Sequence, residues 1–432
     1  MTQARIFFAC VCKNERYFMI SERLLKIANE AEEALAPIYK RIDEISYKNT
    51  ARVLEIFKEH RVSDSMFSGT TGYGYDDIGR DTLDKVYADV FGAESAFVRH
   101  TIPNGTTALS IGLFGLLRPN DVMLSVTNEP YDTLCEVIGL NGANGDGSLA
   151  DFGVKYDQVN FKNEEIDFDG IEKKLNMYGD SVKVVFIQRS KGYLNRPTLT
   201  IDQIGEICDF VHARSHAYVV VDNCYGEFCE DREPCHVGAD MMIGSLIKNP
   251  GGGIAESGGY IAGTKRAVEL ASYRLTSVGT GCEVGATLGQ NRNLFKGFFL
   301  APHVVAQALK TAHFAAYVLE KLDFDVYPKY NEYRSDIIQT VKFGYPEGLI
   351  KFCQGIQASS PVDSYVTPMP WAMPGYQDEV IMAAGAFTQG SSIELSCDGP
   401  VRPPYTAFFQ GSLTYESGKL AILSAAEKLI EE

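Results

Sequence analysis

The chain has 432 residues, 45% of them hydrophobic, which is enough for a large core and allows two or three domains. Its 40 basic and 56 acidic residues give a net charge of −16, which argues against nucleic acid or an anionic membrane surface as the main partner. No apolar run reaches transmembrane length, and the ten cysteines include no CxxC pair. We therefore expect reduced thiols in a cytoplasmic protein without a metal site or a membrane anchor.

The N-terminal part, residues 1–65, is predicted to be an extension followed by a helical arm. Residues 1–18 read as a poorly ordered extension, and a charged helical pattern then runs from Ser21 to His60. Pro37 lies inside this pattern and predicts either two helices or one kinked helix.

Residues 66–300 are predicted to form the large domain. Seven apolar, β-rich runs alternate there with helical segments, at residues 96–102, 121–126, 154–159, 182–188, 217–223, 241–247 and 258–264. Continuous apolar runs are typical of strands covered on both faces, so we expect an α/β fold with a mainly parallel central sheet between helices. Ligands of such folds bind beyond the carboxyl ends of the strands.

Residues 301–432 are predicted to form a smaller α+β domain. Pro302 indicates the start of a new helix, and the chain beyond that helix is richer in proline, serine and tyrosine.

One lysine stands at the end of an apolar strand, in "GSLIKNPGGG" (residues 244–253). Partial desolvation at this position is expected to lower the pKa of Lys248 and to favour the nucleophilic amine. The glycines that follow allow the backbone to approach a ligand closely or to adopt positive φ. The alternative is a lysine that extends from the sheet edge into solvent.

A carboxylate and an anion site accompany this lysine. Asp222 ends the very apolar strand of "VVVDNCYGEF", where a buried carboxylate needs a cation such as a protonated pyridine nitrogen. Gly105, Thr106 and Thr107 open a helix after a strand, an arrangement that suits a phosphate or a plain N-cap at Asn104. Ser245 offers the same phosphate another donor.

An aromatic residue completes the set. Tyr131 follows the strand at 121–126, where its ring could stack on a flat heterocycle or simply pack. A lysine for an imine, an aspartate for a ring nitrogen, a helix start for a phosphate and this ring together predict a pyridoxal 5'-phosphate site.

These motifs resemble those of the methionine gamma-lyase family, whose members are often labelled aluminium-resistance proteins, among the fold-type-I pyridoxal-phosphate enzymes. The stretches that carry the resemblance are "SGTTGYGYDDIGRDTLDKVYADVFGAE", "NGTTAL", "QRSKGYLNRPTLTI", "VVVDNCYGEF", "GSLIKNPGGGIAESGGYIAG" and "LSCDGPVRPPY".

The resemblance implies specific residue roles. Lys248 is the Schiff-base residue, Asp222 the partner of the ring nitrogen, and Gly105, Thr106 and Ser245 lie near the phosphate. It also implies a homo-oligomer, dimer or tetramer, in which Tyr73 and Tyr75 reach a neighbour's active site. Arg402 is a candidate clamp for the α-carboxylate of an amino acid substrate. "QRSKGY" stands where many relatives carry an asparagine, so Gln188, Arg189 and Ser190 receive no role.

The predicted function is a carbon–sulfur lyase that releases a 2-oxo acid, ammonia and a thiol from a sulfur-containing amino acid, by methionine gamma-lyase-like or cystathionine beta-lyase-like elimination. Tyr131 or Tyr73 would protonate the leaving thiolate. An aminotransferase and a non-catalytic binding protein of the same fold remain alternatives.

Overall fold

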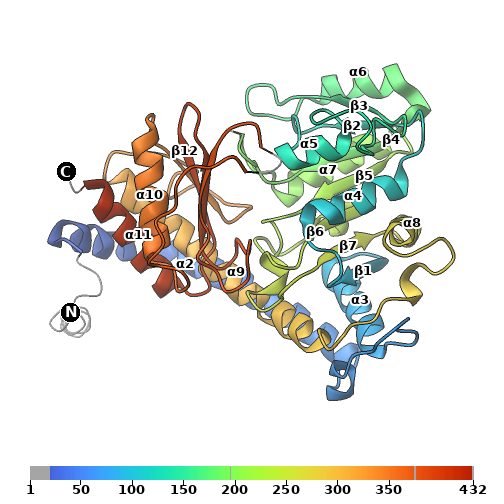
Figure 1. Ribbon diagram of the computed structural model, residues 1–432, viewed down its shortest axis with the longest axis horizontal. Coiled ribbons are helices and arrows are strands. Elements are labelled where there is room, and N and C mark those ends of the chain that lie inside the picture. Colours follow the sequence, from blue (N-terminus) through green and yellow to red (C-terminus); the bar gives the residue numbers. More distant parts are fainter. Residues whose placement is uncertain (1–19, 195, 374–375, 431–432) are drawn as a thin grey trace.

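The computed structural model describes residues 20–194, 196–373 and 376–430, arranged as two lobes that each contain one sheet (Figure 1). The predicted extension at residues 1–18 lies outside the described residues.

The larger lobe holds a seven-stranded sheet, as the seven apolar runs predict. Its strands are β1 (Ser95–Arg99), β2 (Val122–Ser125), β3 (Lys155–Gln158), β4 (Val182–Gln188), β5 (Tyr218–Asp222), β6 (Met241–Ser245) and β7 (Gly259–Gly263). They lie in the order β1-β7-β6-β5-β4-β2-β3, and only β7 is antiparallel to its neighbours. The prediction of a mainly parallel sheet is confirmed.

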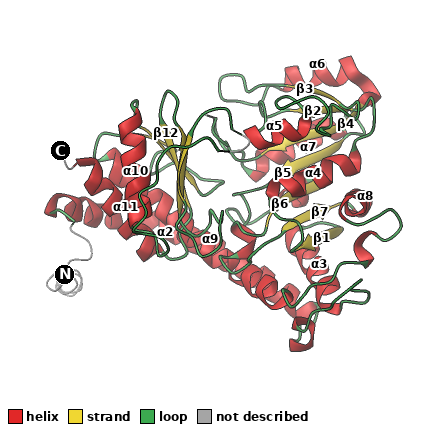
Figure 2. Ribbon diagram, in the orientation of Figure 1, coloured by secondary structure: helices red, strands yellow, loops and turns green. Residues whose placement is uncertain are grey.

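Helices cover both faces of this sheet because successive strand residues point to opposite sides. In β4, for example, Val184 and Phe186 join one hydrophobic cluster, whereas Val185 and Ile187 join another. One face carries α4 (Gly105–Leu116), α5 (Asp132–Ile138) and α8 (Lys265–Leu275), and the other carries α3 (Ile78–Phe91), α6 (Phe168–Tyr178) and α7 (Ile201–His212) (Figure 2). Short 3₁₀ turns are η1 (Asp64–Phe67), η2 (Gly179–Ser181), η3 (Pro234–Val237), η4 (Asn249–Gly251) and η5 (Gly281–Glu283).

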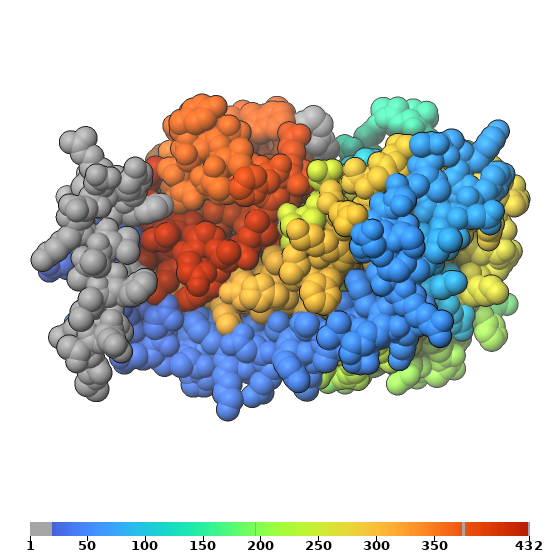
Figure 3. Space-filling view, turned by 90° about the horizontal axis from the view of Figure 1, so that it is seen from below, coloured from blue at the N-terminus to red at the C-terminus, as the bar shows by residue number. Residues whose placement is uncertain are grey.

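A single N-terminal helix, α2 (Glu22–Glu59), joins the two lobes. It contains Pro37 without dividing into two helices. Leu24 and Leu35 belong to the core of the smaller lobe, whereas Val53 and Ile56 belong to that of the larger lobe. In Figure 3 the helix runs as a blue band along one edge of the molecule, beneath both lobes.

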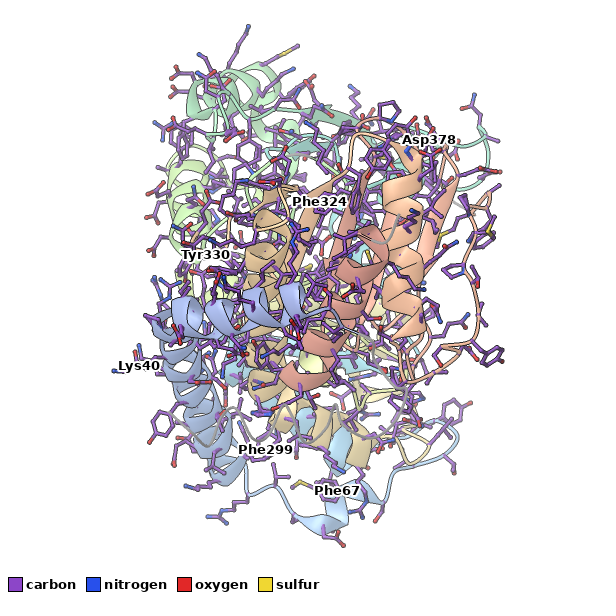
Figure 4. All side chains as sticks on the ribbon, turned by 90° about the vertical axis from the view of Figure 1, so that its left-hand side faces the viewer. Lys40, Phe67, Phe299, Phe324, Tyr330 and Asp378 are labelled. Carbon is purple, nitrogen blue, oxygen red and sulfur yellow. The ribbon has the colours of Figure 1, made fainter. Side chains whose placement is uncertain are left out.

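The long helix α9 (Asn291–Glu320) packs along α2 and corrects the prediction that a helix starts at Pro302. Pro302 lies in the helix interior, where a proline costs roughly 3 kcal/mol. Burial of Leu294, Phe295 and Phe298 on the preceding turns outweighs that cost, since each buried side chain contributes about 1.5–3 kcal/mol. One contact between the two helices joins Phe57 of α2 and Phe299 of α9, whose ring centroids lie 6.0 Å apart. Phe299 is labelled in Figure 4.

The smaller lobe contains a five-stranded antiparallel sheet. Its strands are β8 (Asp325–Tyr327), β9 (Ile338–Lys342), β10 (Val380–Ala383), β11 (Ser396–Pro400) and β12 (Thr406–Gln410), in the order β10-β11-β12-β9-β8. Helices α10 (Pro346–Ala358) and α11 (Tyr415–Ile430) pack together beside it. Throughout the described ranges, every helix is too short or too polar to span a bilayer.

Candidate active site

Polar side chains gather where the parallel strands of the large sheet end. Gln188 ends β4 and pairs with Asp222, which ends β5. Asp222 in turn pairs with Ile243 of β6, two residues before Ser245. The chain therefore brings Gln188, Asp222 and Ser245 to one edge, which is where ligands bind in sheets of this type.

Asp222 is a buried carboxyl group at this edge. Burial raises its pKa, while the amine of Lys248 and the backbone N–H of Cys224 lower it. The Cys224 N–H donates to Asp222 Oδ1 at 3.1 Å. A buried carboxylate with one hydrogen bond of this kind is suited to a cationic partner.

Lys248 is half-buried, and its Nζ lies 4.0 Å from the centroid of the Tyr225 ring. Burial lowers the pKa of Lys248, but the acidic groups of Cys224, Tyr225 and Asp222 outweigh burial and raise it above its ordinary range. The prediction of a lowered pKa is therefore wrong for this protein without a bound group, because several acidic side chains surround the amine. Tyr225 is held at φ +74°, an uncommon backbone state that is characteristic of functional sites.

The glycines after Lys248 allow positive φ angles and close packing of the backbone against a helix. Gly252 and Gly253 adopt positive φ, as predicted. The close approach, however, is to α9, because a Cβ at Gly297 would lie 2.2 Å from the carbonyl oxygen of Gly251. The turn η4 that follows Lys248 is thus packed directly on α9.

The start of α4 lies where the sequence predicts an anion site. A Cβ on Gly105 would lie 3.3 Å from Cys224 Sγ and 3.5 Å from Ser245 Cβ, so the helix start faces the ends of β5 and β6. The Ser245 hydroxyl is buried and has no hydrogen-bond partner among the described residues. A buried donor without a partner at a helix N-terminus fits a phosphate group.

Neighbouring hydroxyl groups have different roles at this helix start. Thr106 Oγ1 lies 2.9 Å from the Tyr131 hydroxyl. Thr107 instead donates from Oγ1 to the N-cap side chain of Asn104 at 3.0 Å, so its hydroxyl supports the cap. The N-cap interpretation is therefore confirmed at Asn104, whose Oδ1 accepts from the Thr107 backbone N–H, and the anion site stays a prediction.

Gln188, which received no predicted role, holds Tyr131 beside Asp222. Gln188 accepts from the Tyr131 backbone N–H through Oε1 at 2.9 Å and donates from Nε2 to the Ser190 carbonyl at 3.1 Å. Burial, followed by the charge of Asp222, raises the pKa of the Tyr131 phenol. Gln188 thus links β4 to the loop that carries Tyr131.

Arg402 lies near this loop but is already paired. Its Nη1 donates to Asp378 at 2.8 Å, and Asp378, labelled in Figure 4, precedes β10. The positive charge of Arg402 also lowers the pKa of Asp132, whose dominant shift is upward through burial. Arg402 is therefore close to Asp132, the residue that follows Tyr131.

Tyr73 and Tyr75 lie on the surface, and among the described residues no hydrogen bond or ring contact connects them with Lys248. They are 76% and 58% exposed and stack on each other with centroids 5.6 Å apart. Their loop pairs with a second surface segment through the Gly285 N–H, which donates to the Tyr73 carbonyl at 2.9 Å. Within one chain, the two tyrosines are not part of the Lys248 site.

Sequence reasoning named Arg402 of the smaller lobe but missed two further residues of that lobe near the site. Tyr376 and Asp398 lie near enough to Lys248 for its charge to lower their pKa values, both of which burial raises. Asp398 stands four positions before Arg402 in "LSCDGPVRPPY", and that motif was the available signal. Arg189 is structural, since it pairs with Glu230 at 2.7 Å and with Asn223 at 2.8 Å beneath the site.

Comparisons with known proteins show that the chain has the fold of the fold-type-I pyridoxal-phosphate proteins. The pyridoxal-5'-phosphate-dependent protein YhfS of Escherichia coli has the same fold, with a TM-score of 0.60 over 89% of this chain and 97% of that one at 16% identity. Within this class the chain belongs to the methionine gamma-lyase family, whose model matches residues 24–430.

Two relatives match over nearly the whole chain. The "Uncharacterized protein YnbB" of Bacillus subtilis (strain 168) is 54% identical over 95% of this chain and 97% of its own length. The crystal structure of a carbon–sulfur lyase involved in aluminium resistance, from Clostridium novyi NT, is 47% identical, with a TM-score of 0.93 over the full length of both chains.

Proposed function

We propose that the chain is a pyridoxal-phosphate-dependent carbon–sulfur lyase that acts on a sulfur-containing amino acid. The observation that carries this proposal is the meeting of Lys248, Asp222 and the partnerless Ser245 hydroxyl at one sheet edge, next to the start of α4. Family membership and the similarity to a carbon–sulfur lyase from Clostridium novyi NT support the same reaction class.

The residues present fit the cofactor at each of its polar ends. Lys248 Nζ would hold its aldehyde carbon covalently, and Asp222 would hold the proton on its ring nitrogen. The Ser245 hydroxyl, the N-terminus of α4 at Gly105 and the Thr106 hydroxyl would bind its phosphate. The Tyr131 ring would lie against its flat face.

The side chains around Lys248 suit an elimination reaction. Arg402 would bind the α-carboxylate of the substrate after exchanging its partner Asp378 for that carboxylate. Lys248 Nζ would remove the α-proton, and Tyr131 Oη, or Tyr73 Oη of a neighbouring chain, would protonate the departing sulfur. When bound, the cofactor supplies the electron sink for the α-carbon. Water then completes the release of a 2-oxo acid and ammonia.

The anchor is tested by replacing Lys248 with alanine. We expect wild-type protein with added pyridoxal phosphate to show visible absorbance and, after borohydride reduction, a pyridoxyl mass on Lys248, because only a covalently held aldehyde is trapped in this way. The Lys248→Ala variant should show neither signal. The control is Lys265→Ala, which changes an exposed lysine at the start of α8.

The outcomes separate the alternatives. A wild-type protein that stays colourless, or a label on another lysine, would contradict the site. Formation of ammonia and a 2-oxo acid from sulfur amino acids identifies the lyase, whereas transfer of the amino group to an added 2-oxo acid identifies an aminotransferase.

A further inference from the structure

The smaller lobe presents the carboxyl group of Asp398 and the ring of Tyr376 toward Lys248, and Tyr193 of the larger lobe lies beside them. Tyr193 follows β4, Tyr376 precedes β10, and Asp398 is the only residue of β11 that is not buried. The rings of Tyr193 and Tyr376 have centroids 5.9 Å apart at 47°, and Tyr193 also contacts Phe408 of β12 at 4.9 Å. These three side chains are half-buried and form a wall beside Lys248.

Asp398 faces the large lobe because of its position on β11. The adjacent Cys397 points to the opposite side of the sheet, where its Sγ lies 3.7 Å from that of Cys353 on α10. The Oδ1 atom of Asp398 is buried and has no hydrogen-bond partner among the described residues. Tyr193 and Gln410 act on this carboxyl group, and its Oδ1 atom remains free to accept from a ligand.

The charge at this position is negative near neutral pH. Burial raises the pKa of Asp398 to about 6, while the Tyr193 and Gln410 side chains and the Lys248 amine lower it. A carboxylate flanked by phenol rings has the chemistry that binds an organic cation, through an ion pair and through the electron-rich ring faces.

One part of the substrate remains to be placed beside Tyr193, Tyr376 and Asp398. Under the proposed function, on which this inference rests, the substrate amine goes to the cofactor near Lys248 and its α-carboxylate goes to Arg402. The remaining part is the thiol portion that leaves.

We infer that Asp398, with Tyr193 and Tyr376, binds a positively charged group on the leaving portion of the substrate. The chain then prefers sulfur amino acids whose thiol part carries an ammonium group over those whose thiol part is uncharged. Asp398 is a specificity-determining residue in this arrangement, rather than a counter-ion reserved for Lys248.

A matched pair of substrates tests this preference. S-(2-aminoethyl)-L-cysteine and S-propyl-L-cysteine have the same length and differ by a terminal ammonium or methyl group. We expect kcat/KM of the holoenzyme to favour the aminoethyl compound about 10-fold, the scale of one partly desolvated ion pair. Asp398→Asn should reduce this ratio to within about 2-fold by lowering only the value for the cationic compound. Tyr376→Leu, on a surface segment, should reduce it in the same direction.

Equal losses on both compounds would overturn the inference and assign Asp398 to Lys248, and an unchanged ratio would overturn it as well. Asp325→Asn is the matched control, because it removes an exposed carboxylate from the edge strand β8 of the same sheet.

Binding without turnover separates this inference from the proposed reaction. Tetramethylammonium cannot condense with an aldehyde, and calorimetric titration of the holoprotein should give a dissociation constant about 10-fold weaker in Asp398→Asn than in wild type or Asp325→Asn. Equal constants in all three would contradict the cation site. If tetramethylammonium binding falls as expected but neither cysteine derivative yields a 2-oxo acid, the cation site stands and the proposed lyase fails.

Discussion

At the residue scale, the loop after β4 contains a buried amine, that of Lys191. Lys191 is fully buried, and its Nζ makes no hydrogen bond among the described residues, lying 4.7 Å from the centroid of the Tyr327 ring. Burial lowers the pKa of Lys191 from 10.5 to about 8, although Asp336 opposes this shift. An ammonium held in this way opposes folding, because its hydration is not replaced.

We therefore predict that Lys191→Met stabilises the protein at pH 7 by about 1–3 kcal/mol in urea unfolding. The pKa of this group is lower in the folded state than in the unfolded state. The amount by which the Lys191 ammonium lowers the free energy of unfolding is thus greatest below about pH 8. This amount declines as the pH rises from about 8 toward 10.5. The advantage of the variant should accordingly be smaller at pH 9.5 than at pH 7.

Lys183→Met provides the control, since Lys183 is an exposed residue of β4. It should show no comparable dependence on pH. A Lys191→Met protein that is less stable than wild type at pH 7 would mean that the amine has a favourable partner in solution.

At the element scale, the position of Lys248 depends on how η4 packs against α9. Gly251 and Gly297 meet with no space for a side chain, since a Cβ at Gly297 would overlap the Gly251 carbonyl. Gly297→Ala should therefore displace η4, cost about 1–3 kcal/mol of stability, and weaken cofactor retention. Urea unfolding and dialysis of the cofactor-bound protein measure the two effects.

The adjacent exposed residue of α9 gives the control for this prediction. Lys296→Ala changes an exposed side chain of the same turn, so it should keep stability within about 0.5 kcal/mol of wild type and leave cofactor retention unchanged. Unchanged cofactor retention in Gly297→Ala would show that η4 does not determine the position of Lys248.

The sequence predicts the elements better than it predicts their directions and contacts. Continuous apolar runs located all seven strands of the large sheet. A strand that is buried on both faces is apolar along its whole length, so its own sequence is enough to reveal it. That pattern contains nothing to indicate that β7 runs antiparallel. Pro302 was misread as a helix start because the residues that bury the preceding turns come from α2 and α3, far away in sequence. Lys248 and Asp222 could be found because they stand at strand ends. Asp398 lies in the middle of β11, where its only signal was its closeness to Arg402 in the sequence.

At the scale of the whole molecule, the surface around Tyr73 suggests a second copy of the chain. Tyr73, Tyr75, Ile78 and Leu288 are all strongly exposed, although each is large and apolar or aromatic. They lie on two segments held together by the Leu288 N–H, which donates to the Thr70 carbonyl at 3.1 Å. Exposed apolar groups that cluster in this way are typical of protein interfaces.

We predict a homo-oligomer in which Tyr73 or Tyr75 completes the Lys248 site of a neighbour, and mixing of subunits provides the test. Tyr73→Ser/Tyr75→Ser and Lys248→Ala proteins should each be inactive. Random reassembly of equal amounts should restore about a quarter of the wild-type activity, because half of the dimers are mixed and one of the two sites in each is intact. Light scattering should report at least a dimer for wild type. A monomer, or a mixture that stays inactive while the subunits demonstrably exchange, would confine the active site to a single chain.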